Sequence, residues 1–301
     1  MLQTMYDLVK RAQALETKKL VVAVANDYHV LEAVEMARSA GIVEAVLVGN
    51  TEEIKRMLAD LKYKVGNYSY LDFADQEEAC RQAVKLVKEN PNYFLMKGFV
   101  DTSVILGAVL NKEHGLRTPN RLSHVSVLEI PTYHKLLLMS DGAMNVDPDV
   151  DIKQEIIENG VHIARAIGIR DPAVGCIAAI EKVNPKMPAT LDAEILVERY
   201  QNGRIKGCVI GGPFALDNAI DRKAAEHKNI TDPIAGNVDF LLMPQIEAGN
   251  VFYKSMMFLA NAKSASVIAG AAKPIVLTSR ADSKETKFYS IALAALVSEL
   301  A

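Results

Sequence analysis

The sequence predicts an α/β protein made of two α/β domains with largely parallel sheets. Short apolar runs alternate with helix-like segments from the start of the chain. The runs are continuously hydrophobic, which is typical of parallel strands covered by helices on both faces. A length of 301 residues is more than one hydrophobic core usually supports, so two domains are expected.

Four strand–helix units account for the first part of the chain. The second helix begins at Asn50 or Thr51, and Glu52 and Glu53 in its first turn suit the positive end of the helix dipole. The expected strands are 20–25, 45–48, 68–73 and 93–96, and the expected helices are 28–40, one from 50 or 51, 76–88 and one from about 102.

The regular alternation breaks after these units. Two strand-like runs, 125–129 and 135–139, are separated by a short segment containing Pro131, which predicts an antiparallel hairpin. We interpret this hairpin as the start of the second domain. A long helix, 152–167, is expected next. More strand–helix units are expected after it, with strands at 174–180, 207–210, 240–243, 265–268 and 274–278.

Composition and charge exclude several classes of function. The formal net charge is −3 and basic residues are scattered, so a nucleic-acid partner is not expected. No apolar run approaches the roughly 18 residues of a membrane span, and the first residues lack the layout of a signal peptide. Cys80, Cys176 and Cys208 are widely spaced and make neither a disulfide framework nor a zinc cluster. Cys176 and Cys208 lie inside apolar strand-like runs, so they are expected to be buried structural thiols. A cytoplasmic location is therefore expected.

The stretch 273–283 contains the sharpest candidate for a functional site. Its apolar run ends in Ser279 and Arg280, just ahead of a helix expected to start at Asp282 or Ser283. Ligands of open α/β proteins bind at such carboxyl ends of strands. A hydroxyl, a guanidinium and free N–H groups at a helix start would suit an oxyanion or a phosphate. A simple helix-entry loop is the alternative interpretation.

Similar polar groups follow two other expected strands. Lys97 and Gly98 precede Thr102 and Ser103, where Gly98 would let a ligand approach the backbone and the hydroxyls could bind phosphate. An ordinary helix N-cap at Thr102 is the structural alternative. Asp141 and Asn145 follow the run 136–139, where they could face a ligand or only order a turn.

The stretch 237–254 repeats the arrangement of an apolar run followed by polar residues. Gly249 permits a tight turn or a close backbone approach, and Asn250 could cap a helix beginning at Val251. Lys254 would then lie in the first turn of that helix. The six histidines show no metal-ligand spacing, so no metal is predicted.

Several of these stretches resemble the phosphate acetyltransferase and phosphate butyryltransferase family. The resemblance rests on "MPQIEAGNVFYK" and "KPIVLTSRADS", and on "FLMKGFVDTSVILGAVL", "LLLMSDGAMNVDPD" and "DPIAGNVDFLLMP" in the family's order. It runs over nearly the whole chain. The compact length and the wording "MKGFVDTS" and "LTSRADS" are most similar to the butyryltransferase branch.

The resemblance implies an architecture and a reaction. Family members have two α/β domains of the kind seen in isocitrate and isopropylmalate dehydrogenases, with the active site in the cleft between them. It therefore implies a first domain of 1–124 plus 275–301 and a second of 125–274. The implied reaction moves a short acyl group, here butyryl, between acyl-CoA and inorganic phosphate by direct attack in a ternary complex. No cofactor beyond coenzyme A is expected, and family habit suggests a homo-oligomer.

The resemblance also implies roles for individual residues. Ser279 and Arg280 match the family's active-site serine and arginine, so Ser279 would donate to the oxyanion and Arg280 would hold phosphate. Asn250 and Lys254 would meet phosphate or the coenzyme. The chain lacks a Gly-x-Ser-x-Gly elbow, so Ser279 is not expected to be an acylated nucleophile.

The chain departs from the acetyltransferase pattern at two positions. The catalytic aspartate seven residues beyond the motif serine is replaced by Thr286, and Glu285 comes one residue earlier. Glu285 is our candidate base, although it could instead form a capping pair with Asp282. Asp282 and Asp141 are rival bases. The family arginine of the earlier helix is missing near Ala108; Arg117 and Arg121 are possible replacements and Lys112 a weaker one.

Three alternatives remain open. The chain could prefer acetyl groups, or it could be a non-catalytic protein of the same fold that binds coenzyme A or phosphate. A metal- and NAD-dependent dehydrogenase of related fold would need clustered aspartates or a Gly-x-Gly-x-x-Gly loop, and Gly211-Gly212-Pro213 is only a faint echo of the latter.

Overall fold

The computed structural model describes residues 2–300, which form two compact units. The terminal unit comprises Met5–Asn120 and the chain from Ser264 onward, and the central unit is built on Arg121–Lys263. The return into the terminal unit therefore falls at Ser264, earlier than the expected boundary at 275. It does so because β10 (Lys263–Ala269) pairs with β11 (Ile275–Val276), Ile268 opposite Ile275.

The sheet of the terminal unit has the strand order β3-β2-β1-β4-β11-β10. Neighbouring strands are parallel except for β10, which runs antiparallel to β11. The other strands are β1 (Lys18–Ala23), β2 (Val43–Gly49), β3 (Ser69–Asp72) and β4 (Tyr93–Lys97). Nearly all side chains of β1, β2 and β4 are buried, which explains their continuous hydrophobicity.

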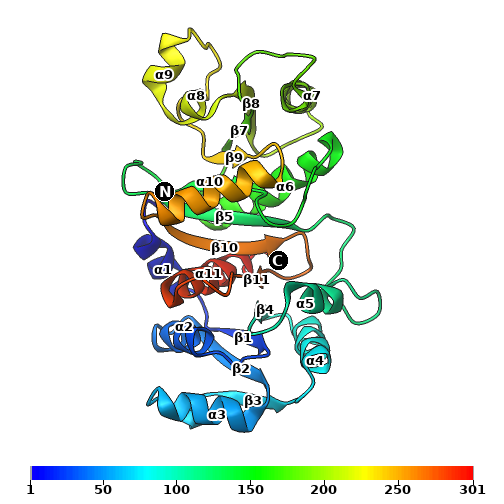
Figure 1. Ribbon diagram of the computed structural model, residues 1–301, viewed down its shortest axis with the longest axis vertical. Helices are drawn as coiled ribbons and strands as arrows, with labels where there is room; N and C mark the ends of the chain where they lie inside the picture. Colours follow the sequence, from blue (N-terminus) through cyan, green and yellow to red (C-terminus); the bar gives the residue numbers. More distant parts are fainter. Residues whose placement is uncertain (1, 301) are drawn as a thin grey trace. The chain divides into compact units, whose positions relative to one another are not determined.

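Helices cover both faces of this sheet (Figure 1). One face carries α1 (Met5–Gln13), α2 (Tyr28–Ser39), α3 (Thr51–Asp60) and α11 (Lys284–Val297), and the other carries α4 (Gln76–Glu89) and α5 (Thr102–Val109). Short polar residues set the helix starts: the Asp27, Asn50 and Asp75 side chains each accept a hydrogen bond from the backbone N–H three residues later. The helix starts expected at 28, 50 or 51 and 76 are confirmed.

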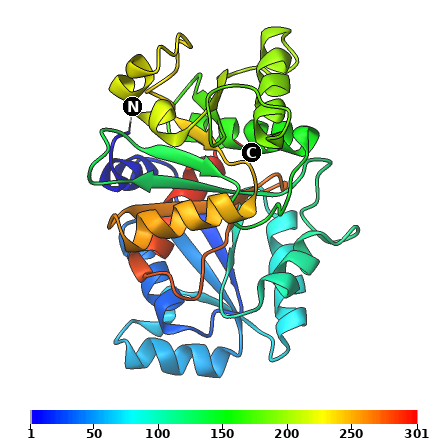
Figure 2. The same cartoon turned by 45° about the horizontal axis from the view of Figure 1, so that its top comes forward.

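The sheet of the central unit has the strand order β5-β6-β9-β7-β8. The predicted hairpin is confirmed: β5 (Ser123–Glu129) and β6 (Leu137–Ser140) are antiparallel, and Figure 2 shows them as two green arrows of opposite direction. The other three strands are parallel to β6, namely β9 (Phe240–Leu242), β7 (Ala173–Ile177) and β8 (Val209–Phe214). The fold is thus α/β with mixed, mostly parallel pairing.

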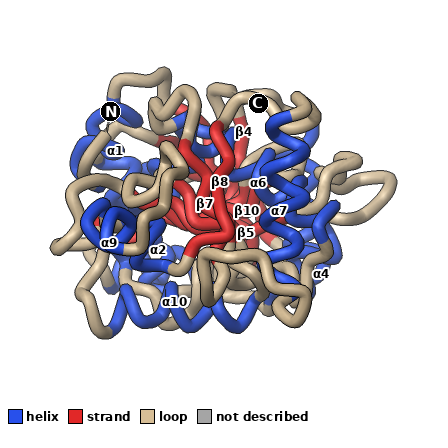
Figure 3. Tube along the Cα trace, turned by 90° about the horizontal axis from the view of Figure 1, so that it is seen from above, coloured by secondary structure: helices blue, strands red, loops and turns tan. Residues whose placement is uncertain are grey.

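The helices of the central unit also lie on either side of its strands. Figure 3 shows β7 and β8 between α7 (Pro188–Gln201) and α9 (Arg222–His227). The other helices are α6 (Val150–Ala166), α8 (Leu216–Ile220) and α10 (Ile246–Phe258). The side chains of α10 pack on a buried apolar cluster that includes Phe214 and Leu241. Among residues 2–300, no helix has the length and apolar character to cross a membrane.

Candidate active site

The predicted site residues fall into two groups, one in each unit. In the terminal unit, β1, β4 and β11 are parallel neighbours, so the segments after their carboxyl ends gather at one edge of the sheet. The terminal unit contains seven of the predicted site residues: Ser279, Arg280, Glu285, Lys97, Gly98, Thr102 and Ser103. The central unit contains the other four: Asp141, Asn145, Asn250 and Lys254.

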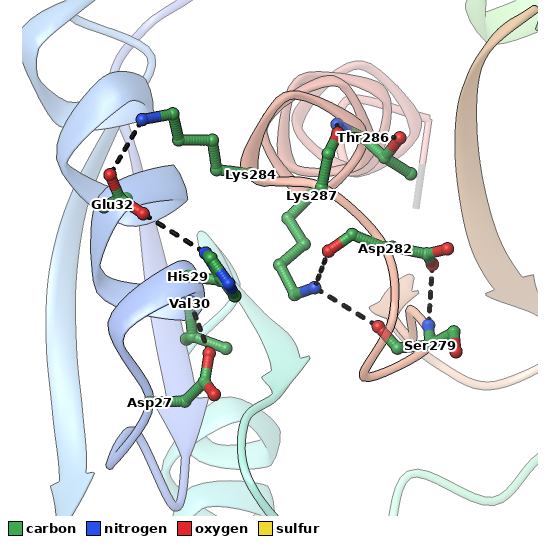
Figure 4. A network of polar contacts seen from close by, with 10 residues as sticks. Asp27, His29, Val30, Glu32, Ser279, Asp282, Lys284, Thr286 and Lys287 are labelled. Carbon is green, nitrogen blue, oxygen red and sulfur yellow. Dashed lines mark hydrogen bonds and ion pairs between the residues drawn. The ribbon is translucent and has the colours of Figure 1, made fainter. Parts of the chain in front are cut away.

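Ser279 lies at the first position of a tight turn that leads into α11 (Figure 4). Its backbone N–H donates to Asp282 Oδ2 at 2.7 Å, and its Oγ accepts from the Ala281 N–H at 3.3 Å. The turn is closed by the Asp282 N–H, which donates to the Ser279 carbonyl at 3.2 Å. Ser279 is exposed while its backbone is held by these hydrogen bonds, so the hydroxyl proton remains available for a further hydrogen bond.

The start of α11 corrects the expected capping pair. Ser283 is the N-cap, and its Oγ accepts from the Thr286 N–H at 3.2 Å. Asp282 instead uses its side chain to hold Ser279. The proposed Asp282–Glu285 capping pair is therefore wrong, and Glu285 lies exposed in the first turn of the helix.

Arg280 is held by two neighbours in the segment that follows β4. Its Nη2 donates to Asp101 Oδ1 at 2.5 Å, and its guanidinium lies over the ring of Phe99, 5.0 Å from the centroid. Stacking and one carboxylate leave most of the five N–H donors of the guanidinium available. The Arg280 guanidinium is therefore held in place with donors free to bind an anion.

Lys97 ends β4 and is 5% exposed. Its Nζ donates to the Gly98 carbonyl at 3.2 Å and the Val100 carbonyl at 3.0 Å. Burial, followed by the positive charges of Arg280 and Lys287, lowers the pKa of Lys97 from its usual value. Asp101 and Asp27 oppose this shift in the pKa. A buried ammonium with two other cations nearby is a natural partner for an anionic ligand.

Backbone packing explains the glycine at position 98, whereas the sequence suggested the approach of a ligand. A Cβ at this position would lie 2.1 Å from the Val24 carbonyl oxygen, and the Gly98 N–H donates to Ala23 at 2.9 Å. The glycine is required because β4 continues into a segment packed directly on the end of β1. Ligand approach is not needed to explain it.

Lys287 was missed by the sequence analysis. It is 3% exposed, and its Nζ donates to the carbonyls of Asp282 at 2.5 Å and Ser279 at 3.2 Å. Burial also lowers its pKa. Figure 4 shows its side chain leaving α11 and ending at the backbone oxygens of the turn. The only sequence signal was a lysine at the end of the polar first turn of a helix that is largely apolar beyond it.

The first turn of α5 presents Thr102 and Ser103 to solvent. The N-cap is Asp101 rather than Thr102, and its side chain pairs with Arg280 instead of capping. Ser103 and Ala108 line a cavity of about 420 Å³, together with Arg81 and His114.

Arg81, a basic residue that the sequence analysis did not consider, lines the same cavity from a different helix, α4. Of the expected replacements, Arg117 and Lys112 are exposed in the terminal unit and lie outside the lining of this cavity, whereas Arg121 belongs to the central unit.

In the central unit, Asp141 and Asn145 organise a buried turn. Asp141 Oδ1 accepts from the Ala143 and Met144 N–H groups at 2.8 and 3.0 Å. Its Oδ2 accepts from Asn145 Nδ2 at 2.8 Å and from the His124 N–H at 3.1 Å. Asp141 is 3% exposed. With both oxygens engaged, it fits the role of ordering the turn better than that of a base.

Helix α10 lies directly against this turn. A Cβ at Gly249 would be 2.2 Å from the Asp141 carbonyl oxygen, and Asn250 Nδ2 donates to the Gly142 carbonyl at 3.0 Å. The expected close backbone approach at Gly249 is confirmed. The expected N-cap at Asn250 is wrong, because α10 already begins at Ile246. Lys254 lies further along, exposed.

A second cavity, of about 660 Å³, lies in the central unit near the carboxyl end of β7 and the start of α10. Apolar residues such as Ile177 and Met187 line it, together with Lys153 and Asp192, which form an ion pair of 2.5 Å. This cavity was not anticipated, because its walls come from four separate parts of the sequence.

Cys176 and Cys208 are buried, as expected, and so is Cys80. Burial raises the pKa of the Cys80 and Cys208 thiols to about 11 and that of Cys176 to about 12. Within the described residues, no three His, Cys, Asp or Glu side chains gather in a way that could hold a metal ion.

A mostly parallel sheet with a serine turn, an arginine and two buried lysines at or near its strand ends defines an α/β protein with a candidate anion-binding site. Comparison with known proteins identifies the family. The chain belongs to the phosphate acetyl/butaryl transferase family, whose model matches residues 3–90 and 74–295.

Both branches of the family contain close relatives. The chain is 44% identical over 297 residues to the phosphate butyryltransferase of Clostridium acetobutylicum, covering 99% of each protein. It is 48% identical over 279 residues to the phosphate acetyltransferase of Thermotoga maritima, covering 93% of this chain and 95% of that protein.

A solved structure also resembles this one closely. The crystal structure of a branched-chain phosphotransacylase from Enterococcus faecalis V583 superposes with a TM-score of 0.84 at 30% identity, over 94% of this chain and 99% of that one. Fold and sequence therefore agree on the family.

Proposed function

We propose that this phosphate acyltransferase transfers a butyryl group between coenzyme A and inorganic phosphate. Support comes from a phosphate butyryltransferase relative that matches over 99% of both chains. The similarly strong match to a phosphate acetyltransferase makes acetyl transfer the alternative. The observation that carries the reaction class is the exposed Ser279-Arg280 turn beside buried Lys97.

The proposed mechanism is direct attack within a ternary complex. A phosphate oxygen attacks the thioester carbonyl of butyryl-CoA, a tetrahedral oxyanion forms, and the coenzyme A thiolate leaves. The Ser279 hydroxyl donates to the oxyanion, since its Oγ already accepts from Ala281 and its proton is the group left to give. Positioning two bound reactants supplies much of the remaining rate.

The charged residues take the other roles. Arg280 and Lys97 bind the phosphate group, with Thr102 and Ser103 as further donors from the first turn of α5. Asn250 and Lys254 on α10 are proposed to contact phosphate or the coenzyme. Glu285 is the proposed base that takes the thiol proton in the reverse direction. No cofactor beyond coenzyme A is required by this scheme.

The test is thiol release from butyryl-CoA and acetyl-CoA, followed with a thiol-reactive dye, with and without inorganic phosphate. The enzyme's own thiols are buried with raised pKa, so the dye will report released coenzyme A. Phosphate-dependent release that is faster with butyryl-CoA supports the proposal. Equal or faster release from acetyl-CoA would reassign the acyl specificity, and release indifferent to phosphate would contradict the reaction.

A further inference from the structure

Two buried lysines, Lys97 and Lys287, lie close enough in the terminal unit for the charge of Lys287 to lower the pKa of Lys97, and among the described residues neither forms an ion pair with a carboxylate. Within residues 2–300, neither Lys97 nor Lys287 lies within ion-pair distance of an acidic side chain. Each ammonium instead contacts two backbone carbonyls: those of Gly98 and Val100 for Lys97, and those of Ser279 and Asp282 for Lys287.

Two buried ammonium groups without acidic partners destabilise the folded protein unless a bound anion compensates their charge. Buried charges are normally paired, because removal from water carries a penalty of several kcal/mol per ion. An ammonium has three N–H donors, so two carbonyls leave one donor unused on each lysine. The positive charges of Arg280 and Lys287 lower the pKa of Lys97 further, while Asp101 and Asp27 oppose that shift. Asp27 and Asp282 oppose the depression of the Lys287 pKa without forming an ion pair.

Lys287 also controls the geometry of the Ser279 turn. Its Nζ binds the carbonyls at both ends of the turn, at Ser279 and Asp282. Figure 4 shows the ammonium next to the Ser279 and Asp282 oxygens, where it places a positive charge beside the backbone of the turn. A lysine at this position therefore both fixes the turn and makes it attractive to an oxyanion.

We propose that Lys287 is a positioning residue for phosphate: its ammonium braces the Ser279–Asp282 turn, and its charge holds the anion that Ser279 and Arg280 contact. The inference rests on the proposed function, in that inorganic phosphate is taken as the anion. It also supplies, from α11, positive charge that the chain lacks at Ala108 on α5.

The experiment compares Lys287→Gln and Lys287→Arg with a matched control, Lys284→Gln. Lys284 lies on the same helix and pairs with Glu32 at 2.8 Å, away from the turn, so its loss removes the same charge from the same element. Two quantities are measured: the KM values for phosphate and butyryl-CoA, and the rise in melting temperature caused by inorganic phosphate.

Lys287→Gln is expected to raise the KM for phosphate by about 10- to 100-fold, the range for one charge-assisted contact. The KM for butyryl-CoA should stay near that of the wild type. Lys287→Arg should recover most of the phosphate affinity, because it restores the charge. An increase in both KM values alike, or no more effect than Lys284→Gln, overturns the proposal.

The stability readout separates this inference from the proposed reaction. If the wild type releases no thiol in response to phosphate, the reaction is wrong, and phosphate should still raise the melting temperature of the wild type but not of Lys287→Gln. If Lys287→Gln does not fold, Lys287→Arg decides: a phosphate KM near the wild-type value supports the role of charge, and a large increase contradicts it.

Discussion

Ser279 combines an exposed hydroxyl with a backbone that is held by hydrogen bonds on both its N–H and its carbonyl. Its N–H, its carbonyl and its Oγ are all engaged within the turn or by Lys287. Preorganised donors of this kind stabilise a developing oxyanion without reorganising during the reaction. The sequence could indicate Ser279 and Arg280 because polar residues directly follow an apolar strand. It could not indicate Lys287, because the side chain that faces the turn depends on the residue at which α11 begins.

Replacing Ser279 by alanine removes the hydroxyl and leaves the turn's backbone intact. We expect kcat to fall by about 100- to 1,000-fold, the effect of losing one oxyanion donor, with little change in stability. The measurement is steady-state thiol release together with thermal unfolding. The control is Ser283→Ala, which removes the N-cap of α11 and should cost about 1 kcal/mol of stability. Unchanged turnover in Ser279→Ala would exclude the oxyanion role.

Glu285→Gln tests the proposed base. Glu285 is exposed and takes no part in the capping of α11, so the substitution should leave stability within about 0.5 kcal/mol. Loss of a general base should lower kcat by about 100-fold or more. The measurement is kcat over a range of pH, beside Asp282→Asn, whose carboxylate holds the Ser279 N–H. Wild-type kcat in Glu285→Gln would remove Glu285 from the mechanism.

At the scale of elements, α10 and the turn after β6 are joined by direct backbone contact. Gly249 brings the helix against Asp141 and Gly142, and Asn250 adds a hydrogen bond to Gly142. The sequence predicted the close approach at Gly249 but placed the helix start at Val251 instead of Ile246. The error arose because a glycine and an asparagine in sequence usually indicate a turn, whereas here tertiary packing places both inside a helix.

Gly249→Ala should destabilise the protein, because the added methyl group would meet the Asp141 carbonyl oxygen at 2.2 Å. Overpacking of this kind costs about 1–3 kcal/mol. Gly107→Ala is the matched control: this helical glycine of α5 has no neighbour within 4 Å of an added Cβ. It should be neutral or stabilise by up to about 1 kcal/mol. Urea unfolding of both variants gives the comparison, and equal stabilities would contradict the packing argument.

At the scale of the whole molecule, the alternation of apolar runs and helices was sufficient to predict the α/β class and the antiparallel hairpin. It was not sufficient to show which strands share a sheet. The short strand β11 pairs with β4, far away in sequence, and nothing local in Ile275 or Val276 specifies that partner. The helix α1 was not expected either, because its burial depends on surfaces supplied by other elements, and the helices that follow β7 and β8 were expected only without bounds.

The free energy of unfolding of the terminal unit should decrease at acid pH, when Glu35 becomes protonated. Hydrogen bonds from Arg38, Tyr68 and Ser39 hold the pKa of this carboxyl at about 2, below its ordinary 4.5. A lowered folded-state pKa stabilises the fold above pH 4.5, and that contribution is lost as the pH falls through the window between 4.5 and about 2.

Glu35→Gln should therefore flatten the fall in stability across this window, measured by urea unfolding at a series of pH values. Glu44→Gln is the control, since its exposed carboxylate only pairs with Lys19 at 3.4 Å. The same pH profile in wild type and Glu35→Gln would contradict the argument.

The division of the terminal unit between two distant stretches also has a consequence during protein synthesis. The ribosome releases Met5–Asn120 first, but β10, β11 and α11, which complete that sheet and cover one of its faces, are made last. The whole of Arg121–Lys263 is available earlier, so this central stretch can complete its fold while the amino-terminal strands still wait for their partners. During that interval, the edge of β4 that later pairs with β11 is open to other strands. A chaperone that shields nascent strand edges would then matter most for the segment that was made first.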